Sequence, residues 1–216
     1  MYFWGAVCLL LGLVVLGVLG CRRLYRFLAR HRPVGGPILV VEGWLPDFAQ
    51  QVALSYFRRG GYQRLLVTGG PVGEGGLLVD YKHYAAVGAA TLKKMGLAAE
   101  EVVELPSPRG LKDRTYLSAL AVGDWLRQER PELRRLDICS LGPHTRRSRL
   151  LFARALGGGF RVGSLAVPSK NFDPDHWWRS SSGFRNVVFE AIALFYARFL
   201  FRWETEGAEK QSRSMD

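Results

Sequence analysis

Five short apolar runs, each followed by a stretch with helical periodicity, constrain this chain more than any other feature of its sequence. The runs occupy residues 38–41, 65–68, 101–105, 136–141 and 161–167. Strands that are apolar along their whole length are typical of parallel sheets covered by helices on both faces. Their alternation with helices indicates βαβ units. The sequence therefore predicts an α/β fold, a Rossmann-like three-layer α/β/α sandwich with a mainly parallel sheet.

The residues after these runs carry apolar side chains at helical spacing, which predicts a helix after each strand. Breaker residues mark several helix ends. Gly96 and Gly157 supply the positive φ that helix C-termini favour, and Pro131 ends another helix. The predicted helices cover residues 48–59, 80–95, 113–128, 144–156 and 183–203.

The amino-terminal segment has the composition of a membrane span. Residues 1–20 contain no charged side chain, and the first one is Arg22. About twenty apolar residues in a helix cross a hydrocarbon core of about 30 Å. A cleaved signal peptide is the alternative, but its basic amino-terminal region is missing. The sequence therefore predicts one transmembrane helix over residues 1–21, a single-pass anchor in the plasma membrane with the lipid bilayer as its partner.

Much of the positive charge of the chain, +11 at pH 7, lies directly behind this segment. Five arginines fall between Arg22 and Arg32, and a linker of prolines and glycines follows up to Pro37. The positive-inside rule places a domain behind such a cluster in the cytoplasm. No basic stripe with interleaved aromatic residues occurs elsewhere, so no nucleic acid partner is predicted. Residues 22–37 are assigned as a basic juxtamembrane segment and linker.

The α/β domain is assigned to residues 38–203. Residues 204–216 are polar, lack apolar periodicity and are predicted to form a disordered tail. The last helix of the domain is nearly all apolar, but Glu190 interrupts it. An unpaired carboxylate is costly to bury, so Glu190 must meet an arginine, face water or carry a function. The helix either packs on the core or rests on the bilayer through its aromatic residues, which are Phe195, Phe199, Phe201 and Trp203.

The sequence indicates neither a metal site nor a disulfide framework. Cys8, Cys21 and Cys139 lack metal-ligand spacing. The short Asp-x-Asp-His pattern at residues 173–176 is of a kind that occurs in loops by coincidence. The chain also lacks the Gly-x-Ser-x-Gly nucleophile motif and the His-Glu-x-x-His metal pair. Its chemistry must therefore come from carboxylates, arginines and histidine.

The turn after the fourth predicted strand places His144 and Arg147 on the first turn of a helix. In open α/β sheets, ligands bind at the carboxyl ends of the strands. A helix N-terminus there favours an anion and lowers the pKa of a nearby imidazole, which predicts a neutral His144 that acts as a base. The alternative is a capping histidine and a solvated arginine.

Three further loops end at the same edge of the predicted sheet. Glu42 and Gly43 follow the first strand, and the glycine-rich loop at residues 68–70 follows the second. Glycines let the backbone approach a ligand closely, although this loop matches neither the P-loop nor the dinucleotide fingerprint. Asp113 precedes the third helix in a natural N-cap position, and the neighbouring Arg114 favours a polar or phosphate-bearing ligand.

These residues predict general acid–base chemistry on an anionic ligand, or simple binding of one. The predicted catalytic residues are His144, Glu42 and Asp113. The predicted ligand-binding residues are Gly43, Thr68, Gly69, Gly70, Arg114, Thr115 and Arg147.

The order of four motifs, VVEGWLPD, LLVTGG, DRTYLSALAV and PHTRRSRLLFARALG, resembles the YdcF-like/SanA-like family, domain of unknown function 218. The likeness covers residues 37–202, and its most specific part is the helix entry with His144, Arg147 and Ser148. The resemblance implies a Rossmann-like domain with a polar cluster at the strand ends and frequent membrane anchoring. It also implies, for some members, a role in envelope integrity or peptidoglycan precursor metabolism, and S-adenosylmethionine as a possible cofactor.

The chain departs from the family pattern in the anion contacts. Its first strand ends in Val-Glu-Gly-Trp rather than in a Gly-Gly-type turn, and Ala49 or Gln50 stands where an arginine is often found. After the second strand, the family has a Ser-Glu-Ala segment, and this chain has Asp-Tyr-Lys-His-Tyr-Ala at residues 80–85 instead.

The resulting hypothesis is a membrane-anchored bacterial enzyme that acts on an anionic, possibly phosphorylated or lipid-linked cell-envelope intermediate. The alternatives are a non-catalytic binding module for a nucleotide or S-adenosylmethionine that is involved in envelope integrity, and a structural scaffold. Resemblance to envelope members places the domain outside the cytoplasm, whereas the arginine cluster places it inside.

Overall fold

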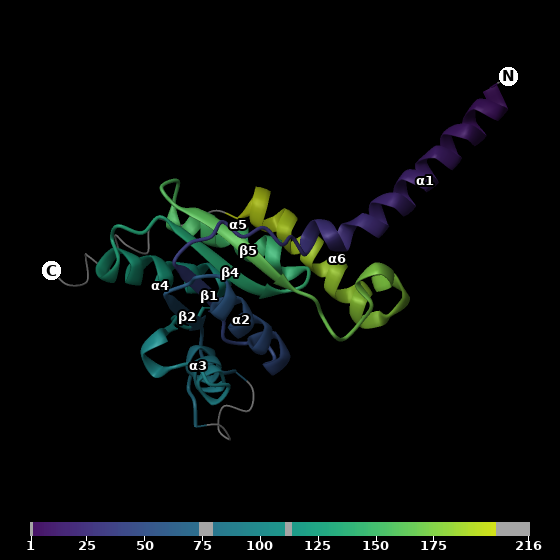
Figure 1. Ribbon diagram of the computed structural model, residues 1–216. Coiled ribbons are helices and arrows are strands. Elements are labelled where there is room, and N and C mark those ends of the chain that lie inside the picture. The colour runs from purple at the N-terminus through teal and green to yellow at the C-terminus, as the bar shows by residue number, and fades with distance from the viewer. Residues whose placement is uncertain (1, 74–79, 111–113, 202–216) are drawn as a thin grey trace.

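The computed structural model describes residues 2–73, 80–110 and 114–201, and it contains a five-stranded parallel sheet (Figure 1). The strand order is β3-β2-β1-β4-β5, and every pairing is parallel. The predicted α/β fold with a parallel sheet and covering helices is confirmed. The strands are β1 (Ile38–Glu42), β2 (Arg64–Gly69), β3 (Val102–Pro106), β4 (Arg135–Leu141) and β5 (Arg161–Val167).

The α-helices follow the strands in the predicted alternation, and α1 projects away from the domain (Figure 1). They are α1 (Tyr2–Leu28), α2 (Asp47–Arg59), α3 (Tyr84–Lys94), α4 (Arg114–Glu129), α5 (His144–Leu156) and α6 (Ser181–Phe195). Shorter helical turns are η2 (Ala99–Glu101), η3 (Pro174–Arg179) and the π-helical turn η4 (Tyr196–Leu200).

Alternate side chains of the central strand β1 point into two different hydrophobic layers, as the pleat of a strand requires. Leu39 and Val41 pack with residues of α2 and α3, whereas Ile38 and Val40 pack with residues of α4 and α5. All four side chains are fully buried. Because both faces of β1 are covered, each of these positions must be apolar, which explains the continuous run in the sequence.

The chain reverses its winding direction at β1, and this opens a crevice at the carboxyl ends of the strands. β1 pairs with β2 on one side and with β4 on the other. Connections that leave these two neighbours in opposite directions cannot fill the space between them, which is where ligands bind in such folds. Glu42 is the last residue of β1 and therefore stands at this point.

Two predicted helix boundaries differ from the structure. α3 begins at Tyr84 rather than at residue 80, because His83 is extended and forms an antiparallel bridge with Pro71. The last helix begins at Ser181, and its α-helical part ends at Phe195, where the backbone continues as a π-helical turn.

The carboxyl-terminal part of α1 packs on the domain through a third hydrophobic cluster. Tyr25 and Leu28 of α1 pack against Phe172, Trp177 and Val187 around η3 and α6. Among the described residues, no helix is both long enough and apolar enough to span a membrane. The predicted transmembrane helix thus has no support from the structure, and the predicted tail at residues 204–216 lies outside the described residues.

The linker that follows α1 is fixed to the sheet by a buried carboxylate. Asp137 of β4 is fully buried and accepts hydrogen bonds from the backbone N–H groups of Val34 (2.7 Å) and Gly35 (3.0 Å). It also accepts one from the Tyr62 hydroxyl at 2.9 Å. A Cβ at Gly163 would lie 1.8 Å from Oδ1 of Asp137, so only glycine leaves room for this carboxylate.

Asp137→Ala should lower the free energy of unfolding by about 3 kcal/mol, because it leaves three donors without their acceptor. Tyr62→Phe removes one of these donors and should cost about 1 kcal/mol. Urea unfolding of the full chain in detergent, followed by tryptophan fluorescence, measures both. Equal losses for the two variants would show that the carboxylate does not hold the linker.

Candidate functional site

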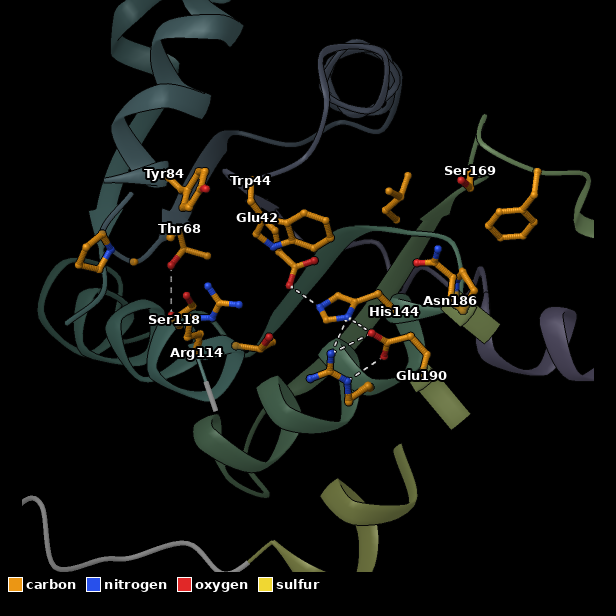
Figure 2. A pocket seen from close by; sticks show the side chains of 18 residues that line it. Glu42, Trp44, Thr68, Tyr84, Arg114, Ser118, His144, Ser169, Asn186 and Glu190 are labelled. Atoms are coloured by element: carbon orange, nitrogen blue, oxygen red, sulfur yellow. Dashed lines mark hydrogen bonds and ion pairs between the residues drawn. The ribbon is translucent and has the colours of Figure 1, made fainter. Parts of the chain in front are cut away.

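A cavity of about 660 Å³ lies at the carboxyl ends of the strands, where the crevice at β1 was expected (Figure 2). The structure brings most of the predicted site residues together on its wall. These are Glu42, Thr68, Gly69, Gly70, Arg114, Thr115, His144 and Arg147.

Two predicted site residues, Gly43 and Asp113, are not among the described residues that line the cavity. Gly43 lies behind it: its N–H donates to the Thr68 carbonyl at 2.8 Å, and a Cβ would lie 2.1 Å from the Tyr84 carbonyl oxygen. The glycine is therefore needed for the close approach of α3 rather than for a ligand. Asp113 lies outside the described residues.

The sequence interpretation missed several residues of the cavity wall. Tyr84, Ser118 and Asn186 line the cavity, and Ser118 and Asn186 come from within helices. Helical spacing puts Ser118 one turn after Arg114, and Asn186 one turn before Glu190. That spacing was a usable signal once Arg114 or Glu190 was suspected.

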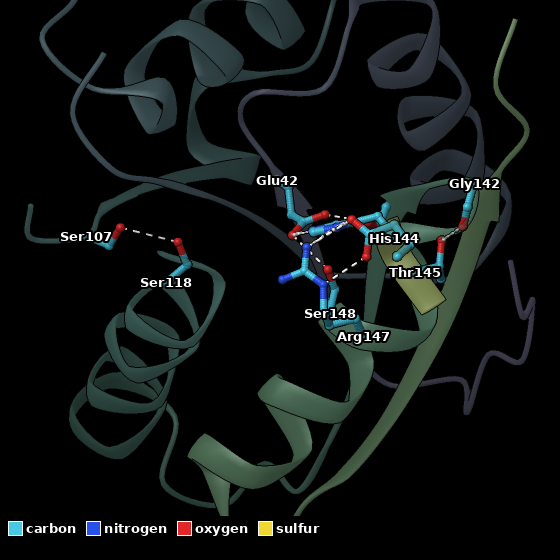
Figure 3. A network of polar contacts seen from close by, with 10 residues as sticks. Glu42, Ser107, Ser118, Gly142, His144, Thr145, Arg147 and Ser148 are labelled. Carbon is cyan, nitrogen blue, oxygen red and sulfur yellow. Dashed lines mark hydrogen bonds and ion pairs between the residues drawn. The ribbon is translucent and has the colours of Figure 1, made fainter. Parts of the chain in front are cut away.

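His144, Arg147 and Glu190 form one compact cluster on the cavity wall (Figures 2 and 3). Glu190 of α6 accepts two hydrogen bonds from Arg147 of α5, Nε to Oε2 at 2.8 Å and Nη2 to Oε1 at 3.0 Å. Nδ1 of His144 lies 2.9 Å from Oε1 of the same carboxylate. Of the three alternatives stated for Glu190, the first is therefore confirmed: it meets an arginine.

The second carboxylate, Glu42, is 3% exposed and lies on the other side of His144. The hydroxyls of Ser140 and Ser148 donate hydrogen bonds to it. Nε2 of His144 lies 3.4 Å from Oε1 of Glu42, and within the described residues it is a buried nitrogen without a hydrogen-bond partner. The imidazole therefore stands between two carboxylates and hydrogen-bonds to only one of them.

This arrangement fixes the charges of the cluster. Burial disfavours the charged imidazole, but Glu42 and the hydrogen bond to Glu190 outweigh burial and raise the pKa of His144 to about 9. Burial likewise opposes the charge of Glu190, but hydrogen bonds from His144 and Arg147 lower its pKa to about 2. His144 in turn lowers the pKa of Glu42 against the effect of burial. The predicted neutral His144 is thus wrong, because two carboxylates act on it more strongly than the helix N-terminus.

The opposite wall of the cavity carries an arginine and hydroxyl groups (Figure 2). Arg114 is exposed, and among the described residues no carboxylate pairs with it. Ser118 lies beside it, its hydroxyl 3.2 Å from that of Ser107, and Thr68 lies next to Ser118. Two walls of different character therefore face each other: a cluster whose charges are paired, and a cation with neighbouring hydroxyls.

The charged side chains described on the cavity wall leave one positive charge unbalanced. Arg147 pairs with Glu190 and His144 with Glu42, so Arg114 adds a positive charge that these pairs do not balance. Among the described residues, no group of three histidine, cysteine or acidic side chains is placed to hold a metal ion.

No model of a known protein family matches this chain, and no curated protein matches it in sequence. The resemblance to the YdcF-like/SanA-like family rests on its four motifs. Each of them contributes to the cavity wall, through Glu42, Thr68, Thr115 and His144 respectively.

The imidazole of His144 should titrate with a pKa of about 9. This value lies above the 6.5 of an unperturbed histidine, so the charged imidazole stabilises the folded state. Its contribution to the free energy of unfolding is complete below about pH 6.5 and is lost as the pH rises through 9. Glu190→Gln should lower the pKa of His144, because it removes one of the two carboxylates. NMR of histidine-labelled full chain measures the titration.

Glu104→Gln is the matched control. Glu104 is an exposed carboxylate on β3, paired with Lys93 at 3.3 Å, and its loss should leave the titration of His144 unchanged. A His144 that titrates near 6.5 in the wild type would contradict the charge arrangement described here.

Proposed function

We propose that this chain is an acid–base enzyme acting on an anionic, phosphate-bearing ligand that binds between Arg114 and His144. The observation that carries the proposal is the nitrogen Nε2 of His144, on the wall of a ligand-sized cavity. It is buried and lies 3.4 Å from the Glu42 carboxylate, but within the described residues it forms no hydrogen bond. A buried nitrogen without a hydrogen bond is costly. Native proteins keep such groups where they serve a purpose, and proton transfer to a ligand is one.

The pair of His144 and Glu42 supplies the proton chemistry. At neutral pH the raised pKa of His144 keeps it protonated, and the lowered pKa of Glu42 keeps that carboxylate charged. In the hydrolysis of a phosphate ester, His144 gives its proton to the leaving oxygen as the P–O bond breaks. Water forms the new bond to phosphorus, and the proton that it releases returns to His144, whose imidazolium Glu42 stabilises. Catalytic hydrogen bonds are often long before a ligand binds, so the 3.4 Å separation suits this role.

Arg114 and the hydroxyls beside it supply the binding of the anion. A guanidinium forms two parallel hydrogen bonds with a phosphate or carboxylate, and hydroxyls add neutral donors. The cavity of about 660 Å³ lies within the usual range for small-molecule sites, about 300–1,000 Å³. Arg147 has a different role: it is paired with Glu190 and fixes the orientation of His144.

The proposal includes anchoring in a membrane by residues 1–21, on the basis of a stretch without charged side chains that is followed by arginines. The positive-inside rule favours a cytoplasmic domain. The resemblance to the YdcF-like/SanA-like family suggests a cell-envelope intermediate as the ligand, and an anchor suits a ligand that is itself lipid-linked.

A non-catalytic binding module for a nucleotide or S-adenosylmethionine is the alternative, and the experiments below distinguish it from an enzyme.

Inorganic phosphate or pyrophosphate should raise the melting temperature of the full chain in detergent. At about 100 times its dissociation constant, a ligand adds about 2.7 kcal/mol to the free energy of unfolding. Arg114→Ala should abolish the shift. Arg127→Ala is the matched control, since Arg127 is also exposed on α4 but lies at its far end, paired with Asp124. Equal shifts in both variants would exclude Arg114 as the anion ligand.

Catalysis is tested by phosphorus NMR of sugar phosphates, nucleotide sugars and isoprenyl pyrophosphates incubated with the full chain. His144→Gln should lower the rate of conversion at least about 100-fold, the usual contribution of a general acid. The wild-type rate should fall as the pH rises through about 9, because His144 then loses its proton.

His176→Gln, which changes an exposed histidine paired with Asp173, should leave the rate unchanged. If the wild type converts none of these compounds but binds phosphate through Arg114, the chain is a non-catalytic binding module and not an enzyme.

A further inference from the structure

The outer side of α6 and η4 presents large apolar side chains to solvent. Each of five residues there is between 54% and 66% exposed, and we call them the outer face of α6: Phe184, Phe189, Ile192, Phe195 and Phe199. Contiguous apolar patches of this kind on a soluble surface mark interaction sites.

Neither the core nor the cavity explains the outer face. The inner side of α6 packs through Val187 against the end of α1 and η3. A second side carries Asn186 and Glu190, which line the cavity. The outer face is a third side of the same helix, and no core cluster of the described residues includes any of its members.

Arg185 and Arg198 lie beside residues of the outer face, and further arginines stand on the elements packed against α6. Arg185 is exposed beside Phe184, and the guanidinium of Arg198 lies 5.5 Å from the ring centroid of Phe199. Further exposed arginines stand on the elements packed beside α6, namely Arg22, Arg23, Arg26 and Arg179. In the described part of this region, Asp175 forms an ion pair with Arg26, and Asp173 forms one with His176.

The orientation of α6 relative to α1 matches a planar surface. Figure 1 shows α6 running across the axis of α1, at the end where α1 joins the domain. The two helices pack together there through the cluster that contains Tyr25, Leu28 and Val187. A bilayer that received residues 1–20 along the axis of α1 would therefore extend along the length of α6.

We propose that the outer face of α6 rests on a lipid bilayer that carries anionic headgroups. An amphipathic helix with aromatic residues on one side and arginines around them inserts its apolar face to the boundary of the acyl chains. The arginines extend to the phosphate groups and attract anionic lipids. This contact is independent of the acid–base chemistry at His144.

The test uses a fluorophore at position 195 of the full chain. Phe195→Cys in a Cys8→Ser, Cys21→Ser background carries a bimane label, while Cys139 is fully buried and stays unlabelled. The protein is added to vesicles of phosphatidylcholine and phosphatidylglycerol that contain a lipid with a nitroxide in its acyl chain. The label at position 195 should be quenched. The same label at Gln51→Cys, an exposed position on α2, should not be quenched.

A second variant tests whether the outer face itself contacts the bilayer or is only held near it by the amino-terminal segment. Ile192→Glu in the chain labelled at position 195 should abolish most of the quenching, because it places a carboxylate in the acyl region. Tyr81→Glu, at another exposed aromatic residue, should leave the quenching unchanged. Quenching at position 195 no greater than at position 51, with or without binding of the chain to the vesicles, would overturn the proposal. So would quenching that Ile192→Glu leaves intact.

Discussion

The burial of one carboxylate at the end of the central strand determines how the rest of the site is built. Glu42 is 3% exposed and its lowered pKa keeps it charged, although burying an isolated carboxylate is very costly. The charge is tolerated because Ser140 and Ser148 donate hydrogen bonds and His144 carries the opposite charge. All three partners belong to β4 and α5, so the position of Glu42 holds this strand–helix unit against β1. The site and the centre of the sheet are thus stabilised by the same interactions.

The charged His144 in turn requires Glu190. An imidazolium beside a single carboxylate would leave Nδ1 unpaired in a buried position, and Glu190 of α6 provides its partner at 2.9 Å. Arg147 then binds both oxygens of Glu190 and completes the cluster. Nδ1 of His144 is hydrogen-bonded to Glu190, whereas Nε2 forms no hydrogen bond within the described residues and lies 3.4 Å from Glu42. Proton exchange by the ring is therefore expected at Nε2.

The sequence was sufficient for the fold and for much of the site, because both follow from local patterns combined with topology. Continuous apolar runs predict a parallel sheet. Because parallel strands all end at the same edge of the sheet, Glu42, Thr68 and His144 must lie at that edge. The protonation of His144 could not be predicted. It depends on the distance between His144 and Glu42, which no local pattern specifies, and on Glu190, which is 46 residues away in a helix of unpredicted orientation. The role of Gly43 was also hidden, since it arises from the approach of Tyr84 in α3.

The helix α6 joins the two proposed surfaces of this protein. Glu190 and Asn186 line the cavity, while the outer face, from Phe184 to Phe199, lies on another side of the same helix. A rigid helix keeps these two sides at a fixed angle, so a bilayer in contact with the outer face would hold the cavity at a constant height above the headgroups. A ligand with an anionic group and an apolar tail could then place the first beside Arg114 and leave the second in the membrane.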